Sequence, residues 1–321
     1  VMAILSIGFS CFDQFFFLNE WPQENTKNFC HDFIESGGGP AANAAWLLGL
    51  WGEDVYYIGH LNQDLYGQRI IAEFAEAGVD TIQVVFSDEM ITPLASVLVN
   101  RLTGSRTIIT RKMQTPPSLT YDQKLKLDDL AERLIAAEEP VTLLVDGHEA
   151  EISEYLIKKL PNARVVMDGG SLRASNIKLA AWTDYFVVSE HFARDYMGYR
   201  ALSTEAEIKA ALIELNKICR GEAFITLGEK GCAFLKSGML QIVPSWLCNA
   251  VDTTGAGDVF HGAFTYGVHY SWHIDNIILF ASLTAAISIE KKGVRESMPD
   301  LAVVHNSLNS YERNLKQYFD E

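Results

Sequence analysis

The sequence predicts an α/β protein with three αβα layers, in which helices cover both faces of a doubly wound, mostly parallel sheet. From residue 122 onward, short apolar segments alternate with helical segments, which is typical of parallel strands joined by helical crossovers. The strand candidates are residues 141–145, 164–167, 185–188 and 223–227. The helix candidates are residues 122–137, 149–160 and 205–219. Ligands of such sheets bind beyond the carboxyl ends of the strands, which is where the sequence places Asp146, Asp168, Ser189 and Gly228.

The composition is that of an ordinary globular protein, with 48% hydrophobic and 21% charged residues in a chain of 321. This length can bury a sizeable core. The net charge is −15, whereas nucleic acids and anionic membranes are bound through basic patches. We therefore expect neither as a partner. Because no 18 uncharged apolar residues run together, we also expect no membrane span.

The five cysteines are odd in number and lack C-x-x-C spacing. They predict reduced core thiols in a cytoplasmic protein rather than a disulfide framework or a zinc site. The apolar run over residues 3–9 follows no basic segment. It predicts a buried first strand and not a signal peptide.

The next segments predict local elements. Residues 25–36 alternate and predict a strand, and residues 66–78 predict an amphipathic helix. Residues 95–100 and 107–111 flank the turn Thr103-Gly104 and predict a hairpin. We interpret most of its arginines as charges that solvate an edge strand; the three are Arg101, Arg106 and Arg111.

A glycine-rich stretch over residues 36–49 predicts close backbone approach to a ligand. Gly38 and Gly39 precede Pro40, which suits a first helical turn. Asn43 then projects an amide from the first turns of the helix. The spacing Gly37-x-Gly39-x-x-Ala42 also fits a degenerate dinucleotide fingerprint, but no clear acidic residue ends a second strand about 20 residues further on.

The most specific stretch is Asp252-Thr-Thr-Gly-Ala-Gly-Asp258. Gly255 and Gly257 open what the apolar spacing predicts to be a helix, and a helix N-terminus binds anions. A carboxylate repels a bound phosphate, so Asp258 makes sense as a base that deprotonates an attacking hydroxyl. The alternative is a helix-terminal charge worth roughly 0.3–1 kcal/mol.

Two further stretches predict a turn and a helix in the last third of the sequence. Thr226-Leu-Gly228-Glu-Lys-Gly231 follows a predicted strand and could form a tight hairpin. Residues 281–292 predict an apolar helix that stops at Gly293.

Together these stretches resemble the PfkB/ribokinase family of carbohydrate and nucleoside kinases, nearly end to end. The resemblance implies one ribokinase-like domain over residues 1–321, with small-sheet lid strands inserted at about 13–36 and 94–112. The outer face of this lid often pairs with a second subunit, so a homodimer is expected. ATP and Mg²⁺, with K⁺ in some members, are the implied cofactors.

The resemblance also implies roles for individual residues. Gly255, Ala256 and Gly257 would form the anion hole, and Asp258 would be the catalytic base. The sugar would be held by Asp13, Gly38, Gly39 and Asn43, with Asp258. The nucleotide would lie along Thr226, Gly228, Gly231, Gly255 and Gly257. A monovalent cation would be held at Asp252, Gly293 and Ser297.

Three departures from the family pattern concern metal and substrate. The N-x-x-E magnesium motif is replaced by Ser-Glu-His-Phe at 189–192, which leaves Glu190 as the candidate for magnesium support. Pro40 and His261 replace a lysine and an asparagine of ribokinases. These strings look closer to kinases of fructose-like and sulfofructose-type sugars, and Lys27 and His148 are candidate contacts to the substrate tail.

The sequence therefore predicts an ATP-dependent sugar kinase. Two alternatives stay open at this point. One is an NAD(P)-dependent oxidoreductase that uses Gly37, Gly39 and Ala42, and the other is a non-catalytic sugar-binding regulator.

Overall fold

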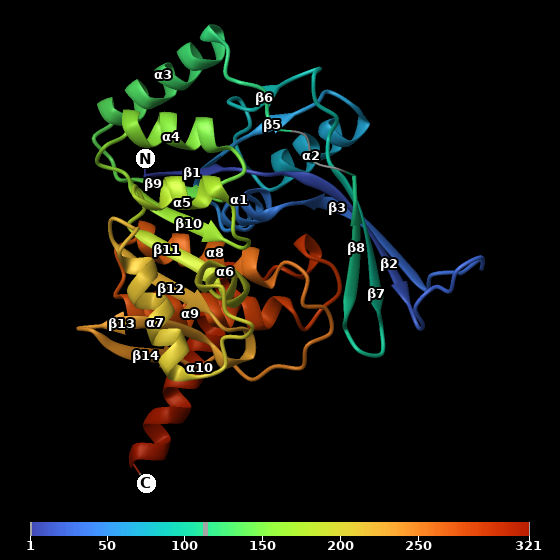
Figure 1. Cartoon of the computed structure of the whole chain (residues 1–321), viewed down its shortest axis with the longest axis vertical. Helices are drawn as coiled ribbons and strands as arrows, with labels where there is room; N and C mark the ends of the chain where they lie inside the picture. The colour runs from blue at the N-terminus through green and yellow to red at the C-terminus, as the bar shows by residue number, and fades with distance from the viewer. Residues whose placement is uncertain (1, 112–114, 321) are drawn as a thin grey trace.

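The computed structural model describes residues 2–111 and 115–320, so residue 112 of the expected lid range lies outside the described residues. Among the described residues, eight strands form the main sheet: β1 (Ala3–Ile7), β4 (Asp54–Ile58), β9 (Val141–Val145), β10 (Arg164–Gly169), β11 (Tyr185–Ser189), β12 (Glu222–Thr226), β13 (Cys232–Lys236) and β14 (Met239–Val243). Their order is β14-β13-β12-β11-β10-β9-β1-β4 (Figure 1). The six strands from β12 to β4 are parallel, and β13 and β14 add an antiparallel edge. The prediction of a doubly wound, mostly parallel sheet is confirmed.

Helices cover both faces of this sheet, as the three-layer prediction requires. One face packs against α1 (Pro40–Leu50), α8 (Ala256–His269) and α9 (Ile274–Ser288), with α10 (Leu301–Asp320) beyond them. The other face packs against α3 (Tyr121–Ala136), α4 (Ala150–Lys159), α5 (Ala174–Ala180), α6 (Glu190–Met197) and α7 (Glu205–Asn216). Along β1, Ile4 joins the first core, whereas Leu5 and Ile7 join the second. Both faces of the strand are thus buried, which explains its continuous apolar run.

A second, four-stranded sheet projects from the side of the main body (Figure 1). Its strands are β2 (Cys11–Leu18), β3 (Asp32–Gly38), β7 (Leu94–Asn100) and β8 (Arg106–Thr110), in the order β3-β2-β7-β8. The helix α2 (Leu65–Glu76) contacts β2 and β3, and the short strands β5 (His60–Leu61) and β6 (Val85–Phe86) pair nearby. Two 3-10 turns, η1 (Gly228–Lys230) and η2 (Arg295–Ser297), complete the elements.

Two predicted elements have different bounds in the structure. The strand expected over 25–36 is confined to β3, because Asn25 has a left-handed φ of 60° and the segment before His31 is an exposed turn. The helix expected over 281–292 is α9, which begins at Ile274 and ends earlier. Its end is fixed because the carbonyl of Ile289 accepts hydrogen bonds from the backbone N–H groups of Val251 and Asp252.

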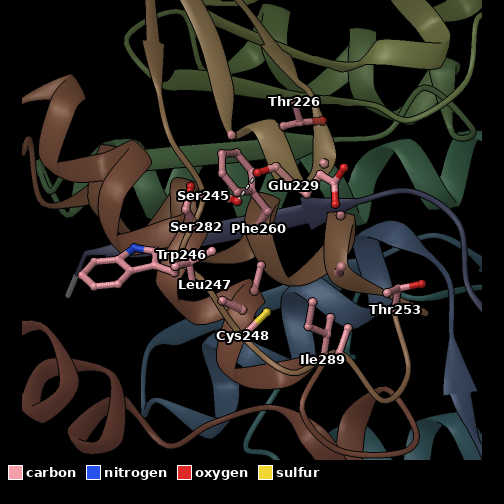
Figure 2. Close-up of a pocket in the computed structure, with 17 residues that line it drawn as sticks. Thr226, Glu229, Ser245, Trp246, Leu247, Cys248, Thr253, Phe260, Ser282 and Ile289 are labelled. Carbon is pink, nitrogen blue, oxygen red and sulfur yellow. Dashed lines mark hydrogen bonds between the residues drawn. The ribbon is translucent and has the colours of Figure 1, made fainter. Parts of the chain in front are cut away.

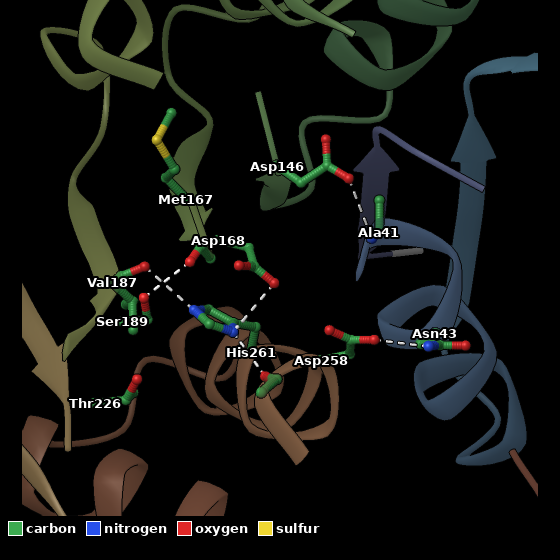
Figure 3. Close-up of polar contacts among 12 residues, drawn as sticks. Ala41, Asn43, Asp146, Met167, Asp168, Val187, Ser189, Thr226, Asp258 and His261 are labelled. Carbon is green, nitrogen blue, oxygen red and sulfur yellow. Dashed lines mark hydrogen bonds and ion pairs between the residues drawn. The ribbon is translucent and has the colours of Figure 1, made fainter. Parts of the chain in front are cut away.

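The carboxyl ends of the parallel strands meet at one edge of the main sheet. Asp146 follows β9 there, Asp168 lies near the end of β10, and Ser189 ends β11. The loops after β1 and β12 reach the same edge, and the N-termini of α1 and α8 point toward it (Figures 1 and 3). No helix in the described part of the chain is both long and apolar enough to cross a bilayer.

Candidate active site

Asp258 lies in the first turn of α8, directly opposite Asn43 on α1 (Figure 3). The amide Nδ2 of Asn43 donates a hydrogen bond of 2.7 Å to Oδ2 of Asp258. The two residues are 215 positions apart in the sequence. The packing of α1 against α8 thus joins the two glycine-containing motifs of the sequence into one site.

The pKa of the Asp258 carboxyl is raised to about 7, mainly by burial and also by the nearby Asp168 carboxylate. The hydrogen bond from Asn43 and the charge of His261 act in the opposite direction. A general base works best when its pKa lies near the working pH, because it is then both deprotonated and basic enough to take a proton. Asp258 has this property near neutrality.

His261 and Asp168 form a buried pair behind Asp258 (Figure 3). His261 Nδ1 lies 3.2 Å from Oδ2 of Asp168 and 2.7 Å from the carbonyl oxygen of Gly257. Its Nε2 lies 3.2 Å from the carbonyl oxygen of Val187. Carbonyl oxygens only accept hydrogen bonds, so a ring nitrogen of His261 donates to its carbonyl only when it carries a proton. The Asp168 carboxylate lies beside Nδ1 of this buried ring.

The sugar-side residues gather on the other flank of Asp258. Asp13 projects from β2 toward Gly38 on β3, and a Cβ at Gly38 would lie only 1.9 Å from Asp13 Oδ2. The thiol of Cys11 donates to Oδ1 of Asp13 at 3.2 Å. Burial raises the pKa of Asp13 to about 6, against the lowering effects of Cys11 and Arg295. Gly38 is thus a glycine because the Asp13 side chain occupies the space of its missing side chain.

Gly39 has a different reason to be a glycine. Its φ is 102°, and a Cβ there would lie 2.5 Å from the carbonyl oxygen of Phe9. The chain therefore passes closely over the end of β1 as it enters α1. Asp146 secures this crossing: its Oδ2 accepts from the N–H of Phe9 at 2.7 Å and, more weakly, from the N–H of Ala41 at 3.4 Å.

This arrangement removes the dinucleotide-binding alternative. The Gly37–Ala42 stretch enters α1 from β3, which belongs to the second sheet and not to the parallel sheet. The space beside Gly37 is filled by the guanidinium of Arg295, and the space beside Gly38 by Asp13. A pyrophosphate could not approach the backbone there as it does in a dinucleotide fingerprint.

A cavity of about 610 Å³ opens on the opposite flank of α8 (Figure 2). Thr226, Gly228 and Gly231 line it from the turn between β12 and β13. That turn joins two antiparallel strands, so the interpretation of its glycines as a tight hairpin is confirmed. The apolar floor and wall come from residues of α8, α9 and the segment before Ala250: Phe260, Ala285, Ala286, Ile289, Trp246, Leu247 and Cys248. Sequence reasoning missed this last segment.

The anion turn lies between the cavity and Asp258. Gly255 has a φ of 73°, and a Cβ on it would lie 2.4 Å from Cγ1 of Val294. Ala256 and Gly257 form the first turn of α8 and line the cavity, and the N–H of Ala256 makes only a long hydrogen bond of 3.4 Å to the carbonyl of Thr253. The turn can thus receive a phosphate that reaches it from the cavity.

Arg106 approaches this turn from the second sheet. Its Nη1 donates a hydrogen bond of 2.9 Å to Oγ1 of Thr253, which lines the cavity. None of the described residues lining the cavity is a lysine or arginine. Arg106 therefore does more than solvate an edge strand, because its guanidinium contacts a residue that lines the cavity.

The candidate cation ligands are partly brought together. Asp252 Oδ2 accepts from the N–H of Gly293 at 3.2 Å, and its Oδ1 accepts from the N–H and hydroxyl of Thr254. The hydroxyl of Ser297, in η2, donates to the carbonyl of Val294. Glu190 is the first residue of α6, after the end of β11. The described residues contain no group of three or more His, Cys, Asp or Glu side chains arranged to hold a metal ion.

Two substrate-tail candidates have different surroundings. His148 is mostly buried at the edge of the main sheet, where its ring stacks on Phe9 with centroids 4.8 Å apart. Lys27 lies in the exposed segment between β2 and β3, over the ring of Phe29. The structure therefore places His148 near the site and gives Lys27 no contact with the site residues above.

Comparisons with known proteins agree with this geometry. Residues 3–301 match the model of the pfkB family carbohydrate kinases. A ribokinase of Lactococcus lactis subsp. lactis (strain IL1403) is 27% identical over 298 residues, covering 92% of this chain and 94% of its own. Fructokinase-2 of Oryza sativa subsp. japonica is 24% identical over 303 residues, covering 86% of each chain.

Solved structures show the same fold. Ribokinase from Giardia lamblia has a TM-score of 0.80 at 22% identity and covers 96% of this chain and 98% of its own. Arabidopsis thaliana ribokinase, complexed with ribose and ATP, has a TM-score of 0.76 at 21% identity and covers 95% and 97%. The predicted ribokinase-like fold, with a main parallel sheet and a smaller one, is confirmed.

The fold and the site define a small-molecule kinase, a phosphotransferase whose acceptor is an alcohol group. The chain belongs to the pfkB family of carbohydrate kinases. Ribokinase and fructokinase relatives match at nearly the same identity, so the comparisons do not favour the fructokinase-like branch that the sequence strings suggest.

Proposed function

We propose that this protein transfers the γ-phosphoryl group of ATP to a hydroxyl of a small carbohydrate, with Asp258 as the general base. The observation that carries the proposal is the position of Asp258. Its half-buried carboxylate lies between the sugar-side group of Asp13, Gly38 and Asn43 and the anion turn that borders the 610 Å³ cavity. An acceptor hydroxyl and a phosphate would meet at this carboxylate and nowhere else among the residues described above.

In the proposed reaction, Asp258 takes the proton of the acceptor hydroxyl as the sugar oxygen forms its bond to the γ-phosphorus. The bond from that phosphorus to the bridging oxygen of ADP breaks, and ADP leaves with the electron pair. The N–H groups of the Gly255–Gly257 turn stabilise charge on the transferring phosphoryl. Phosphoryl transfer depends mainly on positioning and charge stabilisation, so these groups suffice on the protein side.

ATP itself is expected in the cavity beside α8. Relatives support this, because a ribokinase of the same fold was solved with ribose and ATP. The adenine would lie against the apolar wall formed by α9, and the phosphates would run past Gly228 and Gly231 to the anion turn. Magnesium bound with ATP would neutralise phosphate charge, and Glu190 is the side chain that we propose supports it.

Potassium is the second cation that we propose, at Asp252, Gly293 and Ser297. The carboxylate of Asp252 is 1% exposed, and among the described residues no lysine, arginine or histidine forms an ion pair with it. A buried charge that has hydrogen bonds but no counter-ion is costly, so a bound monovalent cation would be favourable here. Activity that is equal in potassium and in tetramethylammonium salts would contradict this assignment.

We also propose that residues 1–321 act as one cytoplasmic kinase unit, with the second sheet as the lid and as a homodimer interface. The strand β8 supports the interface, because Ile108 and Ile109 are 52% and 61% exposed on an unpaired edge. The five cysteines are free, but only Cys11 and Cys232 are buried, so the expectation of core thiols is wrong for Cys30, Cys219 and Cys248. A monomer mass in light scattering at micromolar concentration would contradict the dimer.

The lid supplies one prediction about the nucleotide. Replacing Arg106 with alanine should raise the KM for ATP about tenfold, because hydrogen bonds to charged groups are strong and this guanidinium is exposed beside Thr253. Steady-state kinetics with varied ATP at saturating sugar measures it. Arg101→Ala is the matched control, since that lid arginine contacts Asn19 at 3.5 Å and not the anion turn. Equal ATP KM values for the two variants would contradict the role of Arg106.

The proposed function is tested by a coupled assay of ADP release over free ketoses, aldoses, sugar phosphates, sulfosugars and nucleosides. We expect one carbohydrate class to stimulate ADP release strongly. The remaining alternative, a non-catalytic sugar-binding regulator, predicts sugar binding without ADP release. The complete set of Asp258, Gly255 and Gly257 favours catalysis over that alternative.

A further inference from the structure

Arg295 is a buried arginine beside the proposed sugar site, and no sequence motif pointed to it. It lies in η2, after α9, and is 3% exposed. Its Nη1 forms an ion pair of 2.6 Å with Oε2 of Glu73 on α2, and its guanidinium lies 5.1 Å from the ring centre of Phe74. The side chain therefore bridges the C-terminal loop and the helix that packs on the second sheet.

A second contact of Arg295 leads to the proposed base. Its Nε donates a long hydrogen bond of 3.4 Å to Oδ1 of Asn43. The other end of the same amide, Nδ2, donates to Oδ2 of Asp258 at 2.7 Å. Asn43 thus lies between the guanidinium of Arg295, which only donates hydrogen bonds, and the carboxylate of Asp258, which only accepts them when it is ionised.

This placement fixes which way the amide of Asn43 points. If the amide were flipped, its NH₂ would face the guanidinium of Arg295 and its oxygen would face the carboxylate of Asp258. Both contacts would become repulsive. Arg295 therefore keeps the donor end of Asn43 directed at Asp258.

The glycine-rich strand is shaped around the same guanidinium. A Cβ at Gly37 would lie 2.4 Å from Nη1 of Arg295. The N–H of Gly37 also donates to Oε2 of Glu73 at 2.7 Å. The carboxylate of Glu73 thus anchors both the arginine and the strand that carries the sugar-side glycines.

We propose that Arg295 is a positioning residue that acts through the amide of Asn43 to hold Asp258 in place and in its basic form. The proposal rests on the function proposed above, because it concerns the same base. Arg295 itself does not contact the reacting atoms in this account.

The direction of the expected change follows from the groups that face Asp258. They are His261 on the same helix, Asp168 on β10, Asp13 on β2 and Asn43 on α1. The two carboxylates and burial raise the pKa of Asp258, whereas His261 and the Asn43 hydrogen bond lower it. Loss of Arg295 would free the amide and weaken that hydrogen bond. The pKa of Asp258 should then rise, and activity should be lost at a higher pH than in the wild type.

The test uses Arg295→Met, Asn43→Ala and the combination of the two in the full-length protein. Arg295→Met should lower kcat about 10- to 100-fold with little change in the sugar KM, because misplacement of a reacting group costs rate more than binding. The acid limb of its pH profile should move to higher pH. The combined variant should be no slower than Asn43→Ala alone, because both changes break the same relay.

A second variant separates positioning from folding. Arg295→Met leaves the half-buried carboxylate of Glu73 with its hydrogen bond from Gly37 but without its counter-ion, so the double variant Glu73→Gln with Arg295→Met removes both charges. We expect it to unfold at a temperature near that of the wild type and to keep the loss in kcat. Recovery of activity in this variant would overturn the proposal, since the loss would then come from the stranded carboxylate.

One readout does not depend on activity. The side-chain carbonyl ¹³C signal of Asp258, assigned by its absence in Asp258→Asn, should titrate near pH 7 in the wild type and higher in Arg295→Met. Equal midpoints, multiplicative losses in the combined variant, or a raised sugar KM at unchanged kcat would each overturn the proposal. If the wild type released no ADP with any sugar, the proposed function would fail, and the ¹³C titration would still decide on the relay.

Discussion

Asp258→Asn is expected to lower kcat roughly 10²- to 10⁴-fold, which is the usual cost of losing a general base. Asparagine has nearly the shape of aspartate but cannot accept the proton of the acceptor hydroxyl. It also removes a half-buried charge, so we expect the variant to fold. Turnover at saturating ATP and sugar measures the loss, and calorimetric titration with ATP should show nucleotide binding close to that of the wild type.

The same assignment predicts the pH dependence of the wild type. The base must be deprotonated, and burial places its pKa at about 7. The value of kcat/KM should therefore fall about tenfold for each pH unit below 7 and level off above it. Near-normal turnover in Asp258→Asn, or a wild-type profile that is flat down to pH 5, would contradict the role of Asp258.

Gly255→Ala is expected to have the second large effect, a loss of roughly 10²- to 10³-fold in kcat, because it displaces the donors of the anion turn. The φ of 73° is strained for alanine, and the new Cβ would lie 2.4 Å from Cγ1 of Val294. The turn must shift to relieve this contact, and its N–H groups shift with it. We also expect a lower melting temperature.

Gly257→Ala is the informative comparison for that prediction. A Cβ at Gly257 meets no protein atom within 4 Å, and its φ lies outside the left-handed region. The melting temperature should therefore stay near the wild-type value, and any loss of activity should come from crowding of the phosphoryl group. If Gly255→Ala retained both its melting temperature and its kcat, the anion turn would not need the geometry described here.

The fold could be predicted from the sequence because apolar runs and turn residues, which are local patterns, mark most of its strands and helices. The strand expected over 141–145 is β9 without change, since both of its faces are buried and all of its residues except Thr142 are apolar. The hairpin of the second sheet was equally accessible, because Thr103-Gly104 is a local turn signal. The end of α9 was not, because it depends on hydrogen bonds from Val251 and Asp252 to Ile289.

The site residues that belong to sequence motifs could be predicted. Those that act through contacts between distant parts of the chain could not. Asp258, Asn43 and the glycines belong to recognisable strings. Glu73 and Arg295 look like ordinary surface charges in the sequence, yet they are 222 positions apart and form an ion pair in which Arg295 is buried and Glu73 is half-buried. A sequence pattern carries no information on such a pairing, because it is created by the packing of α2 and η2 around the second sheet.

The role of the glycines before α1 was also only partly predictable from the sequence. The sequence predicts that Gly38 and Gly39 allow a ligand to approach the backbone. In the structure, Gly38 makes room for the side chain of Asp13, and Gly39 lets the chain cross the end of β1. Gly37, before them, makes room for the side chain of Arg295. The motif thus shapes the sugar site partly through the protein groups that it admits.

The most direct test of the central claim is a ³¹P NMR spectrum of the reaction with ATP and the carbohydrate that gives the strongest ADP release. We predict that the γ-phosphorus signal of ATP is replaced by a phosphate monoester coupled to sugar protons, in equal amount to ADP, and that Asp258→Asn shows no such signal over the same time. Inorganic phosphate in place of a sugar phosphate, or a monoester formed equally fast by Asp258→Asn, would contradict the claim.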